Sequence, residues 1–135
     1  MTGENRALNA RVEFAKAEAS LRAAEALAAL GLWDDAVSRA YYAAFHSANA
    51  ALLSEGLQAR THGGLHDLFF QTFVLTGVVT RALAKDLAAL QRYREQADYS
   101  STVRFDATSG GEEVSRAAGV VATLREVLRV RGLLG

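Results

Sequence analysis

The stretch Ser38-Arg-Ala-Tyr-Tyr-Ala-Ala-Phe-His-Ser-Ala-Asn49 decides the fold, because it carries two helical patterns at once. Apolar residues recur through it at steps of three and four, which is the spacing of one buried helix face. These residues are Trp33, Val37, Ala40, Tyr41, Ala44, Phe45, Ala48 and Leu52. A second set follows the same spacing and is polar or aromatic: Arg39, Tyr42, His46 and Asn49. The stretch therefore predicts a helix whose second face meets a partner subunit, a ligand or water.

The whole chain of 135 residues predicts one all-α domain. Half of the residues are hydrophobic, which is enough to bury a core. The chain contains no proline, so no helix is interrupted by one. The only β-branched cluster is Val78-Val79-Thr80, and no internal repeat or linker is visible. We expect an up-and-down bundle of about five helices over residues 1–135, with its core over about 8–131.

The charge balance and the cysteine count narrow the function. Lys+Arg equals Asp+Glu at 15 each, so nucleic-acid binding would rest on a local patch rather than on a basic field. The absence of cysteine excludes disulfides and thiolate chemistry. Residues 1–11 do not resemble a signal peptide, and no run of about 18 apolar residues could span a membrane. A cytoplasmic protein without a membrane segment is the expectation.

Helical periodicity places the elements as follows. Helices are expected over 4–30, from about 32–35 to 54, from 61 toward Gly77, over about 79–98, and from 111 or 112 to about 131. Gly31 fits the left-handed residue that ends the first helix, so the first two helices should be antiparallel neighbours. Residues 99–110 lack periodicity and are rich in small polar residues, which is typical of a mobile surface loop.

Arg94 is a charged residue on an apolar stripe. The spacing Val79, Leu83, Leu87 and Leu90 reaches Arg94 one turn later, whereas Arg92 falls on the wet face. Asp98 stands four residues after Arg94, where the two side chains meet. The pair is therefore either a structural ion pair or part of an anion-binding cleft or subunit interface, to which Tyr99 adds a ring and a hydroxyl.

The histidines allow further hypotheses. Arg39 and His46 lie two helical turns apart and could act as a phosphate-binding and acid/base pair, as RNA cleavage needs, although a histidine beside aromatic residues also fits an interface. His62 and His66 have a metal-ligand spacing, but no glutamate accompanies them, and a hydrogen-bonded histidine at a helix start is favoured. We expect neither a metal nor a cofactor.

Three segments together resemble prokaryotic HEPN domains: Trp33-Asp-Asp-Ala-Val-Ser-Arg-Ala-Tyr-Tyr-Ala-Ala-Phe-His46, Thr61-His-Gly-Gly-Leu65 and Arg94-Glu-Gln-Ala-Asp-Tyr99. The resemblance covers about residues 8–131. It implies a helical bundle that dimerises and is paired with a minimal nucleotidyltransferase, often as a toxin–antitoxin system. Many members of the superfamily are metal-independent RNases in which a late-helix arginine is followed four to six residues later by histidine.

This chain departs from the RNase pattern, because Asp98 stands near the histidine's position and no histidine follows Arg94. The favoured hypothesis is therefore a homodimeric module that binds nucleotide, RNA or a nucleotidyltransferase partner. One alternative is an RNA endonuclease toxin that uses Arg39 and His46, or Arg94 with groups from a second subunit; another is a purely structural bundle. The candidate site residues are Arg94, Asp98, Tyr99, Arg39, Tyr42, His46 and His62.

Overall fold

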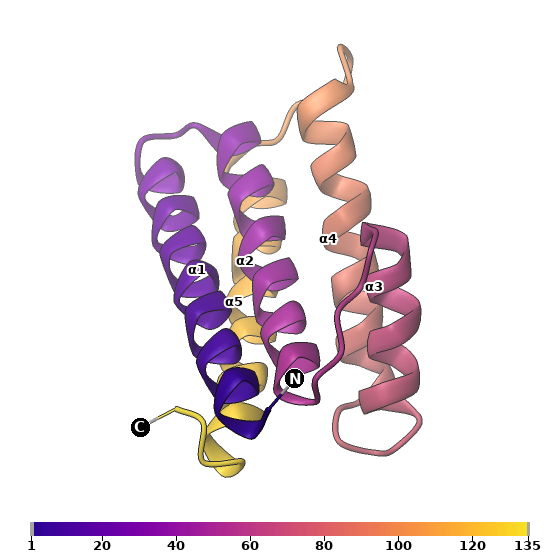
Figure 1. Ribbon diagram of the computed structural model, residues 1–135. Helices are drawn as coiled ribbons and strands as arrows, with labels where there is room; N and C mark the ends of the chain where they lie inside the picture. The colour runs from indigo at the N-terminus through magenta and orange to yellow at the C-terminus, as the bar shows by residue number, and fades with distance from the viewer. Residues whose placement is uncertain (1, 135) are drawn as a thin grey trace.

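Five α-helices and one π-helical turn form the bundle seen in the computed structural model, which describes residues 2–134 (Figure 1). The elements are α1 (Gly3–Ala29), α2 (Trp33–Ser54), α3 (His62–Phe69), η1 (Phe70–Val74), α4 (Arg81–Tyr99) and α5 (Ala107–Val130). No strand occurs within residues 2–134, so the all-α prediction is confirmed. Within the same residues, no helix has both the length and the apolar composition needed to cross a bilayer.

The α1–α2 hairpin is the most extensive interface of the bundle. The helices run antiparallel, as predicted, and Gly31 turns the chain between them with a φ of +75° (Figure 1). Ala10, Ala17 and Ala24 of α1 are fully buried. Because alanine is small, the two helices can approach closely, and α5 packs behind both of them.

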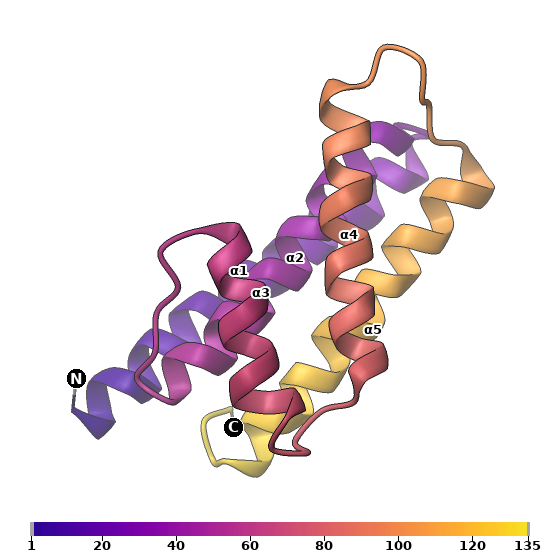
Figure 2. The same cartoon turned by 90° about the vertical axis from the view of Figure 1, so that its right-hand side faces the viewer.

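The larger core cluster lies where α2 meets α3, η1, α4 and α5. Tyr41, Phe69 and Phe73 are its largest buried side chains, so the face of α3 and η1 that carries the two phenylalanines packs into the bundle. Figure 2 shows α3 beside the half of α4 that begins at Arg81, while the other half of α4 extends past α3. Arg94 belongs to the half of α4 that extends past α3.

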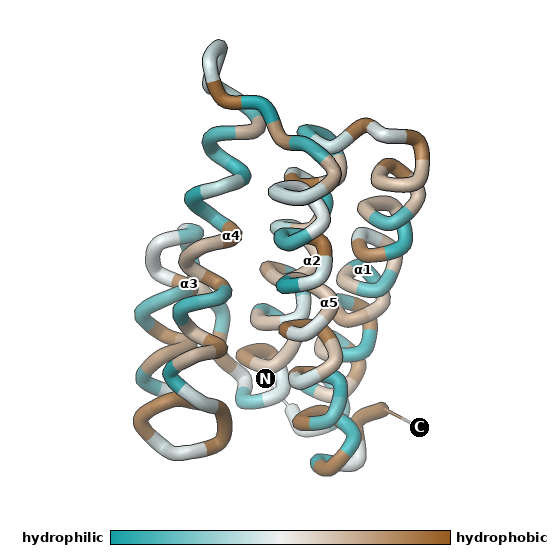
Figure 3. Tube along the Cα trace, turned by 180° about the vertical axis from the view of Figure 1, so that it is seen from behind, coloured by the Kyte–Doolittle hydropathy of each residue, from teal (hydrophilic) through white to brown (hydrophobic). Residues whose placement is uncertain are grey.

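The last turn after α3 is a π-helix, which the sequence pattern did not predict. The Leu75 N–H donates to the Phe70 carbonyl at 3.0 Å, five residues back. Both Phe73 and Val74 are buried in this wider turn. A hydrophobic connection follows η1, in which Leu75 and Val78 are exposed (Figure 3). Gly77, with a φ of +81°, turns the chain between them.

The start of α5 corrects the sequence analysis. The helix begins at Ala107, so the loop predicted over 99–110 spans only Ser100 to Asp106. The Asp106 carboxylate accepts from the N–H groups of Thr108 and Ser109 at 2.9 and 2.8 Å, and the Ser109 hydroxyl accepts from the Asp106 N–H at 3.0 Å. This reciprocal cap satisfies the first turn, so the following glycine pair lies inside the helix instead of ending it.

Gly110 is expected to tolerate no side chain, whereas the adjacent Gly111 should tolerate alanine. A Cβ at Gly110 would lie 2.8 Å from Cε3 of Trp33, and one at Gly111 would meet nothing within 4 Å. We expect Gly110→Ala to lower the unfolding free energy by about 1–3 kcal/mol through overpacking. Gly111→Ala should be neutral or stabilising by up to about 1 kcal/mol. Urea denaturation measures both, and equal effects would contradict the close Trp33 contact.

Candidate functional site

Arg94 occupies the position that the α4 stripe predicts, one turn beyond the fully buried Leu90. Its side chain is only 13% exposed. The guanidinium carbon lies 5.1 Å from the centre of the Tyr41 ring and 5.9 Å from the centre of the Tyr42 ring. A cation at these distances is attracted by the ring faces. Two adjacent tyrosines of α2 therefore provide the surface against which the arginine of α4 packs.

Asp98 joins Arg94 to α2. The Arg94 Nη1 donates to Oδ2 of Asp98 at 3.1 Å, and the Ser38 hydroxyl donates to the other carboxylate oxygen. The Nε of Arg94 is buried and has no hydrogen-bond partner within residues 2–134. The guanidinium is thus held on one side by Asp98 and the tyrosine rings, while one of its N–H donors stays unused.

The pKa of Arg94 reflects this environment. Burial lowers the pKa of the guanidinium, but the neighbouring Tyr42, Tyr99 and Asp98 raise it, and the net pKa is above the usual arginine value. Arg94 therefore stays fully charged. Tyr99 itself is 77% exposed, so this aromatic ring stands in solvent at the end of α4.

His62 is the first residue of α3, and the Thr61 side chain caps that helix start by accepting the Gly64 N–H at 2.8 Å. The imidazole stacks on Phe45 at 4.4 Å between ring centres, and its Nδ1 lies 2.6 Å from the Tyr41 hydroxyl. Burial, together with the positive charge of Arg94, lowers the pKa of His62 below its usual value. The structure therefore brings a neutral imidazole to the same tyrosine that Arg94 covers.

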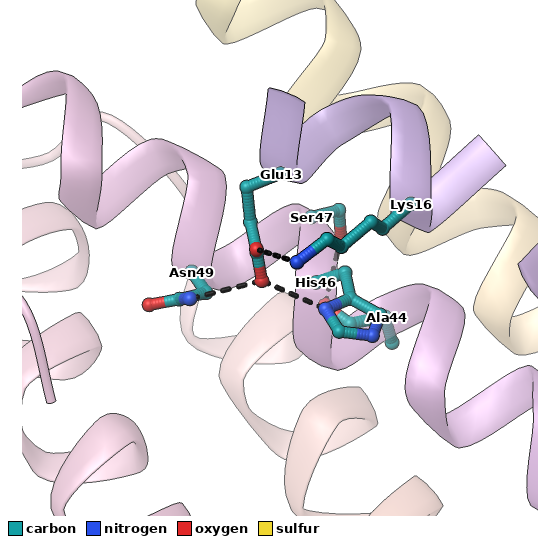
Figure 4. Close-up of polar contacts among 6 residues, drawn as sticks. All are labelled: Glu13, Lys16, Ala44, His46, Ser47 and Asn49. Carbon is teal, nitrogen blue, oxygen red and sulfur yellow. Dashed lines mark hydrogen bonds and ion pairs between the residues drawn. The ribbon is translucent and has the colours of Figure 1, made fainter. Parts of the chain in front are cut away.

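His46 and Asn49 correct the sequence analysis, which assigned the polar stripe of α2 to contacts outside the monomer core. Both bind Glu13 of α1: His46 Nδ1 lies 2.7 Å from Glu13 Oε2, and the Asn49 amide donates to the same oxygen at 2.9 Å (Figure 4). Glu13 is 8% exposed. Burial raises the pKa of Glu13. The hydrogen bonds from His46 and Asn49 and the charge of Lys16 lower it by more than burial raises it, so the net pKa is below the usual value.

The remaining predicted residues have separate neighbours. Arg39 is exposed, and its guanidinium carbon lies 5.8 Å from the centre of the Tyr42 ring. Burial lowers the pKa of His66, against the smaller raising effects of the Gln91 side chain and of Asp67. The Nε2 of His66 is buried without a hydrogen-bond partner within residues 2–134, whereas Nδ1 of His62 lies against the Tyr41 hydroxyl. Among residues 2–134, no group of three or more His, Cys, Asp or Glu side chains is placed to hold a metal ion.

Sequence reasoning missed Glu13, Ser38 and the polar role of Tyr41. Glu13 had a detectable signal, because it lies within the buried α1 pattern of Ala10, Phe14 and Ala17. A carboxylate at such a position requires a partner from another helix. Ser38 gave no comparable signal, since its partner Asp98 is sixty residues away.

Comparison with known proteins identifies the fold and the family. The model of the HEPN domain family matches residues 10–131. The chain belongs to the HEPN domain family. The crystal structure of TT1696 from Thermus thermophilus has the same fold, with a TM-score of 0.75 over 87% of this HEPN chain and 97% of that one, at 21% sequence identity.

Three relatives of this HEPN domain are similar at the sequence level. Putative toxin MJ0605 from Methanocaldococcus jannaschii is 39% identical over 63% of both chains, and Putative toxin MJ0142 from the same organism is 35% identical over 67% of this chain and 61% of that protein. UPF0332 protein glr0978 from Gloeobacter violaceus is 39% identical over 62% of this chain and 67% of that protein. The HEPN chain thus aligns with less than two thirds of the length of either toxin relative.

Proposed function

We propose that this HEPN domain binds nucleotide or RNA through the surface around Arg94, which is built from Arg94, Asp98, Tyr99, Arg39, Tyr42, His46 and His62. The observation that carries the proposal is the Arg94 guanidinium, which packs on two tyrosine rings and is bound by Asp98 through Nη1, while the side chain stays 13% exposed. Arginine recognises phosphate through its fork of donors, and aromatic rings beside it give bases a surface for stacking. Phosphate and base would therefore both find a partner here.

We further propose that the domain acts as a homodimer and is paired with a minimal nucleotidyltransferase in a toxin–antitoxin system. Two relatives carry the name toxin, which supports this role. Tyr99 is 77% exposed and Tyr42 is partly exposed. Exposed aromatic residues are enriched at protein interfaces, so this end of the bundle suits a second subunit or the partner protein. Light scattering of the purified domain measures its oligomeric state.

Replacing Arg94 tests the binding proposal directly. We expect Arg94→Ala to weaken the binding of a fluorescein-labelled single-stranded RNA by about tenfold or more, because a hydrogen bond to a charged group is lost together with the cation. Arg92→Ala is the matched control, since Arg92 is exposed on the same helix and its loss changes the net charge equally. Fluorescence anisotropy measures both. Equal weakening by the two variants would show that only overall charge matters.

A double replacement separates binding from folding. Arg94→Met together with Asp98→Leu removes the ion pair without leaving an unpaired charge, so the variant should keep most of its stability. We expect this variant to fold and to lose RNA binding. A folded double variant that binds RNA like the wild type would refute the role of Arg94.

Metal-independent RNA cleavage is a second candidate function. It is favoured by two imidazoles, His46 and His62, whose rings lie 5.5 and 4.4 Å from the Phe45 ring and could exchange protons with a bound ribose. Incubation of labelled RNA with the purified domain in chelator tests this function. Cleavage that disappears in His46→Phe or His62→Phe would favour it, and intact RNA would leave binding as the function.

A further inference from the structure

Glu13 fixes the tautomer of His46. The pKa of Glu13 is lowered, so its carboxylate is ionised at neutral pH and can only accept hydrogen bonds. The His46 Nδ1, 2.7 Å from Glu13 Oε2, must therefore carry the proton. In the neutral form of His46 the other nitrogen then has a free lone pair, so this form presents Nε2 as a hydrogen-bond acceptor.

The acceptor points out of the α1–α2 interface. Figure 4 shows the second ring nitrogen of His46 directed away from Glu13. This nitrogen has no hydrogen-bond partner within residues 2–134, and the side chain is 24% exposed. The two oxygens of Glu13 contact His46, Asn49 and Lys16, which fixes the carboxylate. The fixed carboxylate in turn fixes the orientation of the His46 imidazole through Nδ1.

His62 presents the opposite group. The Tyr41 side chain is buried, and burial raises the pKa of its phenol, so the hydroxyl keeps its proton and needs an acceptor. Its hydrogen-bond partner is His62 Nδ1 at 2.6 Å. The hydroxyl therefore donates to Nδ1, and Nε2 of the neutral His62 carries the hydrogen. The two imidazoles that contact Phe45 thus offer one acceptor and one donor.

The acceptor lies one helical turn from the arginine site. Arg94 is joined through Asp98 to Ser38, which precedes Tyr42 by one turn, and His46 follows Tyr42 by one turn. The Tyr42 ring is 5.9 Å from the Arg94 guanidinium carbon and 6.4 Å from the His46 ring. A phosphate on Arg94 and a base on Tyr42 would leave the sugar of the same strand within reach of His46.

We propose that His46, positioned by Glu13, accepts a hydrogen bond from a ribose 2′-hydroxyl and thereby makes this site select RNA over DNA. The inference rests on the proposed binding function. Within the sugar–phosphate backbone of a strand, the 2′-hydroxyl is the only hydrogen-bond donor, and DNA lacks it. An acceptor whose lone pair is fixed in advance gains this bond without reorienting, whereas DNA leaves it unpaired.

The test compares three labelled single strands of one sequence: RNA, DNA and 2′-O-methyl RNA, which keeps the sugar oxygen but has no donor. Fluorescence anisotropy of the wild-type domain should show RNA bound about fivefold more tightly than the other two, the effect of one hydrogen bond. Glu13→Gln should bring this ratio close to one with little change in DNA affinity, because an amide can donate to Nδ1 and release the tautomer. His46→Phe should likewise bring the RNA-to-DNA ratio close to one, and this result does not depend on the Glu13 variant folding.

Two variants serve as controls. Asn49→Ala removes the other side-chain donor to the same Glu13 oxygen but leaves the His46 bond, so the RNA-to-DNA ratio should stay as in the wild type. Arg94→Ala should weaken all three ligands by a similar factor. Wild-type protein that binds none of the strands overturns the proposed function. Binding of RNA and DNA with equal affinity, or of 2′-O-methyl RNA as tightly as RNA, overturns the role of His46 alone.

Discussion

Replacing Tyr41 with alanine is expected to lower the unfolding free energy by about 3–5 kcal/mol, the cost typical of removing a large buried aromatic side chain. Tyr41 is fully buried in the larger core cluster. The same ring supports Arg94 at 5.1 Å, and its hydroxyl binds His62. The replacement therefore opens a cavity and releases both site residues. Urea denaturation, followed by circular dichroism of the helices, measures the loss.

Two variants separate the contributions of Tyr41. Tyr41→Phe keeps the ring and removes the hydroxyl, which leaves His62 Nδ1 without its partner, so we expect a loss of about 1–2 kcal/mol. Tyr42→Ala removes a neighbouring tyrosine that is only partly buried, and it should cost clearly less than Tyr41→Ala. A Tyr42 variant as unstable as Tyr41→Ala would mean that the core does not centre on Tyr41.

Replacing Arg116 with methionine is expected to lower the unfolding free energy by about 2–4 kcal/mol at neutral pH, because it strands a buried carboxylate. Glu113 is 3% exposed. The Arg116 Nε donates to Glu113 at 2.9 Å, and its Nη1 donates to Asp86 at 2.9 Å. Arg129→Met is the matched control, since Arg129 pairs with Glu126 at the same spacing on α5 but in solvent, where such a pair contributes about 1 kcal/mol or less.

The pH dependence of this effect has a definite sign. Burial holds the pKa of Glu113 above its usual value even beside Arg116. A carboxyl with a raised folded-state pKa binds its proton more tightly in the folded protein, so stability falls as the pH rises from the unfolded-state pKa through the folded one. Without Arg116 the pKa rises further. The destabilisation by Arg116→Met should therefore be smaller at mildly acidic pH than at neutral pH, and a loss that did not depend on pH would contradict a stranded Glu113.

The sequence predicts those parts of the site that depend on one helix. The position of Arg94 follows from the α4 stripe, and its contact with Asp98 follows from the four-residue spacing within the same helix. The bond between His46 and Glu13 joins residues 33 positions apart, and periodicity within α2 contains no information about which α1 residue lies opposite. For the same reason, the polar stripe of α2 could be recognised, but its partners could not.

Some helix boundaries could likewise be predicted from the sequence, and others could not. The α1–α2 turn was predictable because Gly31 adopts the left-handed conformation that few other residues favour. The start of α5 was mispredicted because Gly110 and the small polar residues before it were interpreted as a loop. Gly110 lies in the helix because the cap formed by Asp106 and Ser109 starts α5 earlier, and the position requires glycine because the Trp33 ring packs where a side chain would otherwise be. The η1 turn has no known sequence signature of its own, and the chain pattern there is that of an ordinary helix.

The short α1–α2 connection also bears on the order in which the molecule folds. Contacts between segments close in sequence form quickly, because little chain entropy is lost in closing a short loop. The most extensive interface of the bundle is also its most local helix pair, so the hairpin can form while α4 is still detached. The tyrosines of α2 would then be in place before Arg94 reaches them. Transient detachment of α4 in the native protein would likewise dismantle the Arg94 surface and leave the bond between Glu13 and His46 intact, so the two halves of the site would differ in amide hydrogen exchange.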